Sequence, residues 1–307
     1  MEQTTSHILM VRPKCFGFNT QTAANNVFQG KMSLSAAEIQ QRAEQEFDAF
    51  VKKLRAHGVH VKVEEDSETP PKPDAIFPNN WFCSMPDGTL FLFPMFAPNR
   101  RLERRGEIIA GLEKDYRIRK VEDWSVYEKE GVMLEGTGSI VADHVNKHLF
   151  ACISPRTDEM LVEKFARNVG YKPVIFTAED EGETLIYHTN VMLHIGVDYA
   201  VVCLDSIRSD TERAMVEERL SLNGRQIVDI TLSQLYQYAG NMLQVKNDAG
   251  ELFTILSARA FASLSDGQKA IISSSSRLLP MDIEVIETIG GGSARCMMAE
   301  IFFASKT

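Results

Sequence analysis

The apolar residues of this 307-residue chain recur at two spacings, one helical and one extended. Within residues 36–57 they return every three or four positions, which is the spacing of one face of a helix. The sequence Ser35-Ala36-Ala37-Glu38 before this run is a capping box, and Gly58 after it is a stop signal. Residues 59–63 then alternate between apolar and polar, as in a half-buried strand. The pattern therefore predicts a helix followed directly by a strand.

The same order of elements recurs along the chain. Turn-forming residues at 86–89 and 247–250 precede apolar strands, as in hairpins, and capping boxes at 209–212 and 265–268 open further helices. The apolar run His7–Val11 is expected to supply a strand that the last unit lacks. We expect helices at 102–112, 158–169, 210–223 and 266–275, and strands at 90–93, 117–121, 148–153, 173–177, 200–204, 226–230, 252–256 and 283–289.

A polar residue marks the same point in each of these units. The marked residues lie 55, 53, 53 and 55 positions apart, and a period of this size indicates an array of one supersecondary unit. If the five units are equivalent, their polar turns lie at the same end of a ring and the marked side chains converge. We therefore expect an α/β fold of five helix–strand units around a pseudo-fivefold axis, forming one domain over residues 1–307. The marked residues are Asn80, Glu135, His188, Asn241 and Cys296.

The fifth of these turns contains three consecutive glycines. Gly290–Gly292 follows the apolar run that we expect to be a strand, and it leads through Arg295 to Cys296. Consecutive glycines let the backbone turn tightly and lie close to a bound group. A lone cysteine near an apolar strand is more often an inert small hydrophobe. Cys296 follows the other four marked residues at the same spacing, and this regularity favours a functional cysteine over an inert one.

A cysteine, a histidine and a carboxylate in one cleft can form a nucleophilic site. In such a site the thiolate of Cys296 attacks, His188 moves protons, and Glu135 orients the imidazole. A free thiol has a pKa of about 8.5, so a positive neighbour must stabilise the thiolate, and His188 and Arg295 are the candidates. Taken singly, His188 is more often a satisfied core histidine and Glu135 a solvated turn residue, and Asn79 and Asn80 are compatible with ordinary turn residues.

Composition narrows the classes of function. The chain has 33 basic and 42 acidic residues, a net charge of −9, and no basic run, which disfavours nucleic acid and anionic membranes as partners. No apolar stretch reaches the roughly 20 residues of a membrane span. The first residues lack the basic region and apolar core of a secretory signal, so we expect none. Five scattered cysteines without a C-x-x-C pair argue against disulfides and a zinc site, so we expect a cytoplasmic protein without metal or cofactor.

At these positions the sequence resembles the guanidine-group-modifying enzymes of the pentein fold, which include arginine deiminases, dimethylargininases and amidinotransferases. The resemblance is sharpest at residues 77–80, 135–136, 188–190 and 290–296. It implies that Cys296 is the nucleophile, that His188 is the histidine of an H-x-D motif, and that Glu135 is its acidic partner.

Two positions depart from the deiminase pattern. Asn80 and Asn190 stand where deiminases of this family carry aspartates that grip the guanidinium. An aspartate offers only acceptors, whereas an amide offers a donor and an acceptor, which matches a neutral ureido group. The sequence is therefore similar to the citrulline-hydrolysing, amidinotransferase-like branch. We expect hydrolysis of citrulline to ornithine, carbon dioxide and ammonia through a carbamoyl-cysteine, with Asn79, Asn80, Asn190 and Arg295 as substrate-binding residues.

Three alternatives stay open at this stage. One is a deiminase or dihydrolase that acts on arginine, methylarginine or succinylarginine, and another is an amidinotransferase with an amine acceptor. The third, from a different class, is a non-catalytic pentein that binds a macromolecular partner. The sequence leaves the oligomeric state open, with a homodimer as one alternative.

Overall fold

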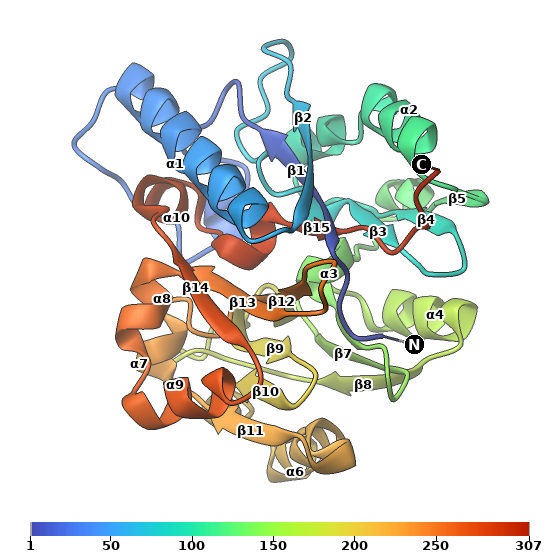
Figure 1. Cartoon of the computed structure of the whole chain (residues 1–307), viewed down its shortest axis with the longest axis vertical. Coiled ribbons are helices and arrows are strands. Elements are labelled where there is room, and N and C mark those ends of the chain that lie inside the picture. Colours follow the sequence, from blue (N-terminus) through green and yellow to red (C-terminus); the bar gives the residue numbers. More distant parts are fainter. Residues whose placement is uncertain (1, 307) are drawn as a thin grey trace. The chain divides into compact units, whose positions relative to one another are not determined.

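The computed structural model describes residues 2–306, and this part of the chain forms five three-stranded sheets with helices between them (Figure 1). The strands are β1 (His7–Arg12), β2 (His60–Glu65), β3 (Phe82–Ser84), β4 (Thr89–Leu92), β5 (Lys120–Asp123), β6 (Val141–Asp143), β7 (His148–Cys152), β8 (Lys172–Phe176), β9 (Leu193–Ile195), β10 (Tyr199–Val202), β11 (Gln226–Asp229), β12 (Leu243–Lys246), β13 (Leu252–Ser257), β14 (Arg277–Met281) and β15 (Ala299–Glu300).

All five sheets share one topology. In each sheet the middle strand runs antiparallel to the strand that follows a polar turn and parallel to the strand that follows a helix. The sheet orders are β15-β1-β2, β3-β4-β5, β6-β7-β8, β9-β10-β11 and β12-β13-β14. The repeat predicted from the spacing of polar residues is therefore present as five copies of one strand arrangement.

The N-terminal strand completes one of these sheets, as the sequence predicted. Strand β1 is the middle strand, with Leu9 opposite Ala299 of β15 and Ile8 opposite Val61 of β2. It is antiparallel to β15 and parallel to β2, so it matches the middle strand of the other four sheets.

The α-helices are α1 (Ala36–Ala56), α2 (Gly106–Asp115), α3 (Gly136–Ser139), α4 (Glu159–Val169), α5 (Thr189–Met192), α6 (Asp210–Leu220), α7 (Leu232–Leu235), α8 (Ala258–Ser263), α9 (Asp266–Ser273) and α10 (Glu284–Gly290). The 3-10 helices are η1 (Ala23–Asn25), η2 (Pro78–Asn80), η3 (Pro98–Glu103), η4 (Ser125–Lys129), η5 (Leu204–Ser206), η6 (Leu222–Gly224) and η7 (Ala294–Met297). The capping boxes predicted at the starts of α1 and α9 are present, and Gly170 ends α4 in the left-handed conformation.

The strand predicted at residues 283–289 is wrong. These residues form helix α10, and the strand of this unit is β14, directly upstream. Ile283, Ile286 and Ile289 are three positions apart and all buried, which is helical spacing, whereas Glu284 and Glu287 interrupt any strict alternation. The helix predicted at 102–112 is also divided, with η3 before α2, and the next strand begins at Lys120 and not at 117.

The chain divides into two compact units, and each collects distant segments of the sequence. One unit contains residues 2–4, Thr137–Asp282 and Ser293–Arg295, and it holds the three sheets from β6 to β14. The other contains Thr5–Gly136, Ile283–Gly292 and residues 296–306, and it holds the sheets of β1 and β4. The single domain over residues 1–307 and the arrangement of five units around an axis stay predictions.

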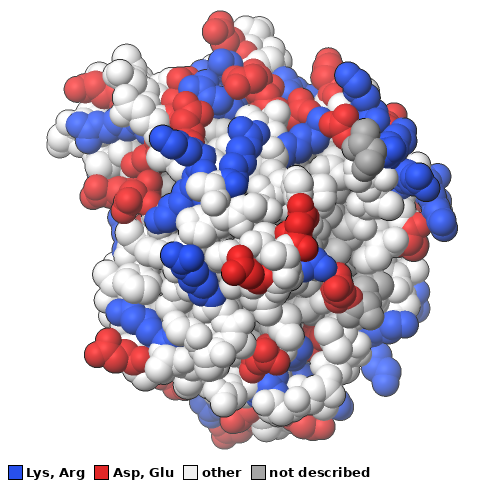
Figure 2. Space-filling view, in the orientation of Figure 1, with Lys and Arg blue, Asp and Glu red and all other residues white. Residues whose placement is uncertain are grey.

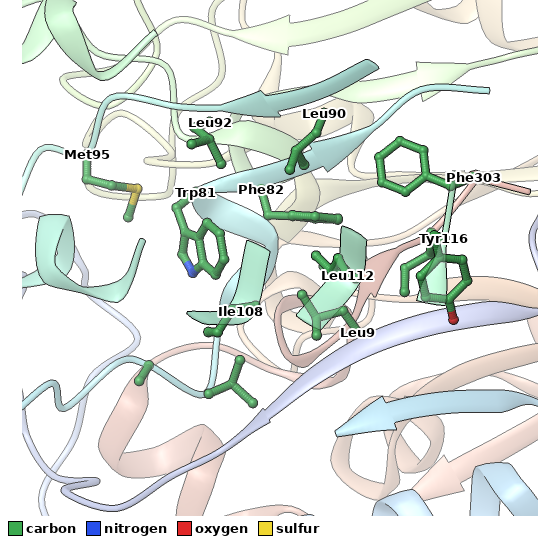
Figure 3. Packing of buried hydrophobic residues seen from close by; sticks show 14 residues of the cluster. Leu9, Trp81, Phe82, Leu90, Leu92, Met95, Ile108, Leu112, Tyr116 and Phe303 are labelled. Carbon is green, nitrogen blue, oxygen red and sulfur yellow. The ribbon is translucent and has the colours of Figure 1, made fainter. Parts of the chain in front are cut away.

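Within the second of these units, α1 runs beside β1 and β2 and also contacts α10 (Figure 1). A cluster of buried side chains joins β1, β3 and β4 to α2 (Figure 3). Trp81 and Leu112, at its centre, have no exposed surface. This core fixes the segment that leads through η2 into β3, and the first polar turn lies in that segment.

Surface charge, helix hydropathy and the grouping of possible metal ligands each limit what this protein can bind. On the face drawn in Figure 2, basic and acidic side chains are intermixed, a distribution that does not favour binding to polyanions. No helix among the described residues is long and apolar enough to cross a membrane. Among the same residues, no group of three or more histidine, cysteine or acidic side chains could hold a metal ion.

Candidate active site

The five marked residues occupy equivalent places in the fold. Each lies just upstream of the strand that runs antiparallel to the middle strand of a sheet. Asn80 ends η2 before β3, Glu135 precedes α3 and β6, His188 is the N-cap of α5 before β9, Asn241 precedes β12, and Cys296 lies in η7 before β15. Their side chains are buried, with at most 4% of the residue surface exposed. Burial of polar groups at these equivalent points is unlike ordinary surface turns, whose polar side chains face water.

The first two polar turns contact each other. Gly136 has φ +45°, and a Cβ atom there would lie 2.5 Å from the carbonyl oxygen of Asn79 and 2.8 Å from that of Asn80. Only glycine permits both the backbone conformation and this approach. The neighbouring Glu135 side chain is fixed, because its Oε1 atom accepts a hydrogen bond of 2.8 Å from the backbone N–H of Phe96. Glu135, Asn79 and Asn80 therefore come together within one unit.

A buried arginine holds the Asn80 side chain. Nη1 of Arg100 donates a hydrogen bond of 2.8 Å to Oδ1 of Asn80. The guanidinium also forms a bidentate pair with Glu103, with both nitrogen–oxygen distances 2.9 Å, and Asp74 lies 3.7 Å from Nε. Nδ2 of Asn80 is buried and has no hydrogen-bond partner among the described residues. The site therefore presents a buried amide donor without an acceptor.

Burial and charge act in opposite directions on the Arg100–Glu103 pair. Burial alone would lower the pKa of the Arg100 guanidinium, but the charges of Glu103, Asp74 and Glu135 outweigh it and raise that pKa. Burial raises the pKa of the Glu103 carboxyl to about 7, against the lowering effect of Arg100. Arg100 is therefore a permanently charged donor beside Asn80.

The glycine turn before Cys296 packs against the first polar turn. Gly291 ends α10 with φ +65°, and its carbonyl oxygen accepts a hydrogen bond of 3.1 Å from Nδ2 of Asn26. A Cβ atom at Gly290 or at Gly292 would lie 2.9 Å or 3.0 Å from the ring of Phe77. The glycines therefore permit a close approach of the backbone to the segment that carries Asn79 and Asn80.

In the other unit, hydrogen bonds fix the segment that carries His188. The hydroxyl of Ser154 donates to the carbonyl oxygen of Tyr187 at 2.8 Å, so the residue before His188 is tied to the chain after β7. The hydroxyl of Thr189, after His188, accepts from the N–H of Cys152 at 2.8 Å and donates to the carbonyl oxygen of Ser139 at 2.5 Å. The backbone on both sides of His188 is therefore held by hydrogen bonds. An acid–base group needs a fixed position of this kind.

Asn241 joins two polar turns of this unit. Its Nδ2 donates to the carbonyl oxygen of Asn190 at 2.9 Å, and its Oδ1 accepts from the N–H of Arg295 at 3.1 Å. Asn241 is fully buried, and a Cβ atom at Gly240 would lie 2.5 Å from the carbonyl oxygen of Val191. Because Arg295 is bonded to Cys296 along the chain, this amide links the turn of His188 to the residue before the cysteine.

The structure therefore brings the predicted residues together in two groups. Asn79, Asn80 and Glu135 meet in the unit that also contains Cys296, and Asn190 and Arg295 meet through Asn241 in the unit that contains His188. Cys296 and His188 belong to different units, so their approach to each other stays a prediction.

Sequence reasoning missed two parts of this arrangement. Arg100 and Glu103 lie in a segment rich in charged residues, 100–105, where nothing in the sequence distinguishes the buried arginine from the partly exposed arginines beside it. The bridging role of Asn241 was also missed, and the only signal for it was its register with the other four turns.

The chain is similar to known proteins by family and by fold. The family model for N,N dimethylarginine dimethylhydrolase, eukaryotic, matches residues 12–303. Among curated proteins, none matches the sequence significantly.

Solved structures share the fold at low sequence identity. The N-terminal domain of ArgZ, a cyanobacterial arginine dihydrolase of the ornithine–ammonia cycle, gives a TM-score of 0.74 at 17% identity, over 96% of this chain and 97% of that domain. AgrE in complex with L-arginine gives 0.72 at 15% identity, over 96% of this chain and 40% of that one. The dimethylargininase of Pseudomonas aeruginosa in complex with citrulline gives 0.64 at 16% identity, over 97% and 100%. At these identities the likeness establishes the fold alone.

Proposed function

The chain belongs to the N,N dimethylarginine dimethylhydrolase family of the pentein superfamily, and on that premise we propose that it is a cysteine-dependent hydrolase of citrulline or a close ureido amino acid. The family supports hydrolysis at a guanidino-type carbon. The preference for a ureido group is the finer part of the proposal and needs its own argument.

The observation that carries this preference is the buried amide donor of Asn80. A guanidinium group has only donors, so it would leave Nδ2 of Asn80 without an acceptor. A ureido group has a carbonyl oxygen that accepts this hydrogen bond. A buried donor that stays unsatisfied costs about 1–3 kcal/mol, which is enough to set a preference between two substrates of similar shape.

The proposed reaction proceeds through a covalent intermediate. The Cys296 thiolate attacks the ureido carbon, His188 protonates the leaving nitrogen, and ornithine departs as the carbon–nitrogen bond breaks. Water deprotonated by His188 then attacks the carbamoyl-cysteine, the carbon–sulfur bond breaks, and the carbamate released decomposes to carbon dioxide and ammonia. The sum is citrulline and one water giving ornithine, carbon dioxide and ammonia.

The remaining residues of the site assist these steps in the proposal. Glu135 orients the imidazole of His188 and balances the charge that it gains. A ureido substrate brings no charge of its own, so Arg295 and protonated His188 must stabilise the thiolate of Cys296. Asn190 and Asn79 complete the contacts to the ureido group, which requires both donors and acceptors.

The second candidate function is that of an arginine dihydrolase, which the fold of ArgZ favours. An enzyme of this kind would convert arginine and two waters to ornithine, carbon dioxide and two molecules of ammonia. It would share the citrulline-hydrolysing half of the reaction, so the two candidates differ in whether arginine is a substrate.

The test is a substrate panel of citrulline, arginine, methylarginine, succinylarginine and agmatine, with ornithine and ammonia measured in parallel. We expect ornithine and one equivalent of ammonia from citrulline, and a loss of at least about 1,000-fold in Cys296→Ala. Cys15→Ala is the control, because Cys15 lies outside the polar turns, and it should retain wild-type activity. Conversion of arginine to citrulline, without turnover of citrulline itself, would refute the proposal.

A further inference from the structure

We propose that Glu128 is a positioning residue that fixes Glu135 through the backbone of the segment Phe93–Phe96. This inference rests on the proposed function, in which Glu135 orients the imidazole of His188, and it adds a residue that the polar turns do not include. Glu128, the segment and Glu135 lie in the same unit of the fold. Glu128 has no contact with the substrate in this proposal and acts only through the segment.

This segment lies between β4 and η3 and belongs to no helix or strand. A sheet ladder therefore does not satisfy its backbone groups, which need other hydrogen-bond partners. The N–H of Phe93 donates to the carbonyl oxygen of Trp81 at 3.0 Å. Pro94 has no N–H, so the donors of Met95 and Phe96 remain. Two carboxylates accept these two hydrogen bonds.

The two carboxylates are those of Glu128 and Glu135. Oε1 of Glu128 accepts from the N–H of Met95 at 2.9 Å. Oε1 of Glu135 accepts from the N–H of the next residue, Phe96, at 2.8 Å. The side chain of Met95 belongs to the buried cluster of Figure 3, so the core holds this residue as well. Because one planar peptide joins the two residues, a shift of the backbone at Met95 would displace the donor that holds Glu135.

Two arginines in turn hold Glu128. Nη1 of Arg104 lies 2.7 Å from Oε1 of Glu128 and donates to the carbonyl oxygen of Phe93 at 3.0 Å. Nε of Arg101 lies 3.4 Å from Oε2 of Glu128 and donates to the carbonyl oxygen of Met95 at 2.9 Å. The side chains of Arg104 and Glu128 are each 11% exposed, so water screens this pair less than it screens a surface ion pair. The carboxylate and the arginines therefore satisfy both N–H and C=O groups of the segment.

The proposed mechanism requires a fixed carboxylate at Glu135. A carboxylate that orients an imidazole contributes to the reacting complex and not to binding of the ureido group. Loss of the Glu128 contact should therefore lower kcat and leave KM nearly unchanged. Misplacement of a catalytic group by about 1 Å can cost about 100-fold in rate, so a partial release of the segment should cost about tenfold.

The experiment compares two substitutions of Glu128 with a matched control. Glu128→Ala removes the acceptor of the Met95 N–H. Glu128→Gln keeps an oxygen that can accept this hydrogen bond and loses only the charge, so it is the conservative variant. Glu130→Ala is the control, because Glu130 is exposed and its side chain forms no hydrogen bond or ion pair among residues 2–306.

We expect Glu128→Ala to lower kcat for citrulline at least about tenfold, with KM within about twofold of the wild-type value. Glu128→Gln should recover kcat to within about threefold of wild type, and Glu130→Ala should match wild type. A second readout separates positioning from a general loss of structure. In the Glu135→Asp background, where the carboxylate is drawn back from the Phe96 N–H, Glu128→Ala should cost less than about twofold in kcat. A thermal melt establishes that each variant is folded.

If Glu128→Ala does not fold, Arg104→Met takes its place, because it removes the ion pair and the hydrogen bond to Phe93, and the same split between kcat and KM is expected. Folded variant protein with wild-type kcat, or an equal loss in the wild-type and Glu135→Asp backgrounds, would overturn the role of Glu128 while citrulline hydrolysis stands. A wild-type enzyme that consumes arginine and not citrulline would overturn the ureido preference alone, and the same variants are then compared on arginine. Turnover of neither substrate would overturn the proposed function, and this inference with it.

Discussion

Gly136 controls how closely the first two polar turns approach each other. Its positive φ and the two carbonyl oxygens of Asn79 and Asn80 leave no room for a side chain. The adjacent Glu135 is the proposed partner of the catalytic histidine, so a displacement of the backbone here would move a reacting group. Stability and activity should therefore depend together on this glycine.

We predict that Gly136→Ala lowers the free energy of unfolding by about 3 kcal/mol or more, because left-handed strain and a clash with backbone oxygen add. Gly170→Ala is the matched control, since Gly170 also has positive φ but nothing lies within 4 Å of its Cβ position. That change should cost only about 1 kcal/mol and leave kcat unchanged. Denaturant unfolding and citrulline turnover measure both effects, and equal losses for the two variants would contradict the steric explanation.

At single positions, the sequence predicted which turn residues are buried better than it predicted how their side chains are oriented. The register of Asn80, Glu135, His188 and Cys296 identified four buried turn residues, because a regular period is visible in the sequence itself. The orientation of the Asn80 amide was not predictable, since it depends on Arg100, a residue 20 positions away in a charged segment that reads as surface.

Helix α10, which leads to the glycine turn, is capped by a side chain from another helix. Its N-cap residue, Ile283, forms no side-chain capping bond. The carboxylate of Glu46, on α1, instead accepts hydrogen bonds from the N–H groups of Val285 and Ile286 at 2.9 Å and 3.0 Å. A carboxylate at this point satisfies two free donors and interacts favourably with the helix dipole.

We predict that Glu46→Ala lowers the free energy of unfolding by about 1–2 kcal/mol, the usual cost of a lost N-cap. Activity should fall as well, because α10 holds the turn that precedes Cys296. Gln45→Ala, on the exposed side of the same helix, should change stability by less than about 0.5 kcal/mol. The measurements are urea unfolding and citrulline turnover, and equal stability of the two variants would exclude a capping role.

Helix α10 also shows why secondary structure could not be predicted from the sequence at this point. Helices α1 and α9 were predicted because each begins with a local capping box. The cap of α10 comes from Glu46, which is more than 200 residues away in the sequence, so the helical spacing of the isoleucines at 283–289 had no local capping residue to support it. A short apolar run without its own cap is ambiguous between helix and strand, and here packing against α1 decided.

In the unit that holds the three sheets from β6 to β14, two buried histidines make the free energy of unfolding depend on pH. Burial, with Arg295 adding repulsion, lowers the pKa of His144 from 6.5 to about 4 and that of His194 to about 3. Both are held neutral against tyrosines, His144 on Tyr171 and His194 on Tyr199. Between pH 6.5 and pH 4 the unfolded chain therefore binds more protons than the folded one, and stability falls as the pH is lowered.

We predict that these two groups reduce the free energy of unfolding by about 2–3 kcal/mol between pH 7.5 and pH 5.5. His194→Gln should remove about half of this dependence, because a glutamine does not titrate. Urea unfolding at several pH values provides the measurement, and a pH-independent wild type would refute the assignment.

The pairing of β1 with β15 has a consequence for how this protein is made. Strand β1 is translated before its antiparallel partner β15, which follows some 290 residues later, after the strands of the other four sheets. During synthesis one edge of β1 therefore lacks its neighbour, and an open strand edge invites pairing with other chains. Cys296 is translated immediately before that partner strand. The proposed nucleophile and the strand that covers this edge of β1 are therefore translated within a few residues of each other. A chain that stops before residue 296 would have both an uncovered strand edge and no Cys296.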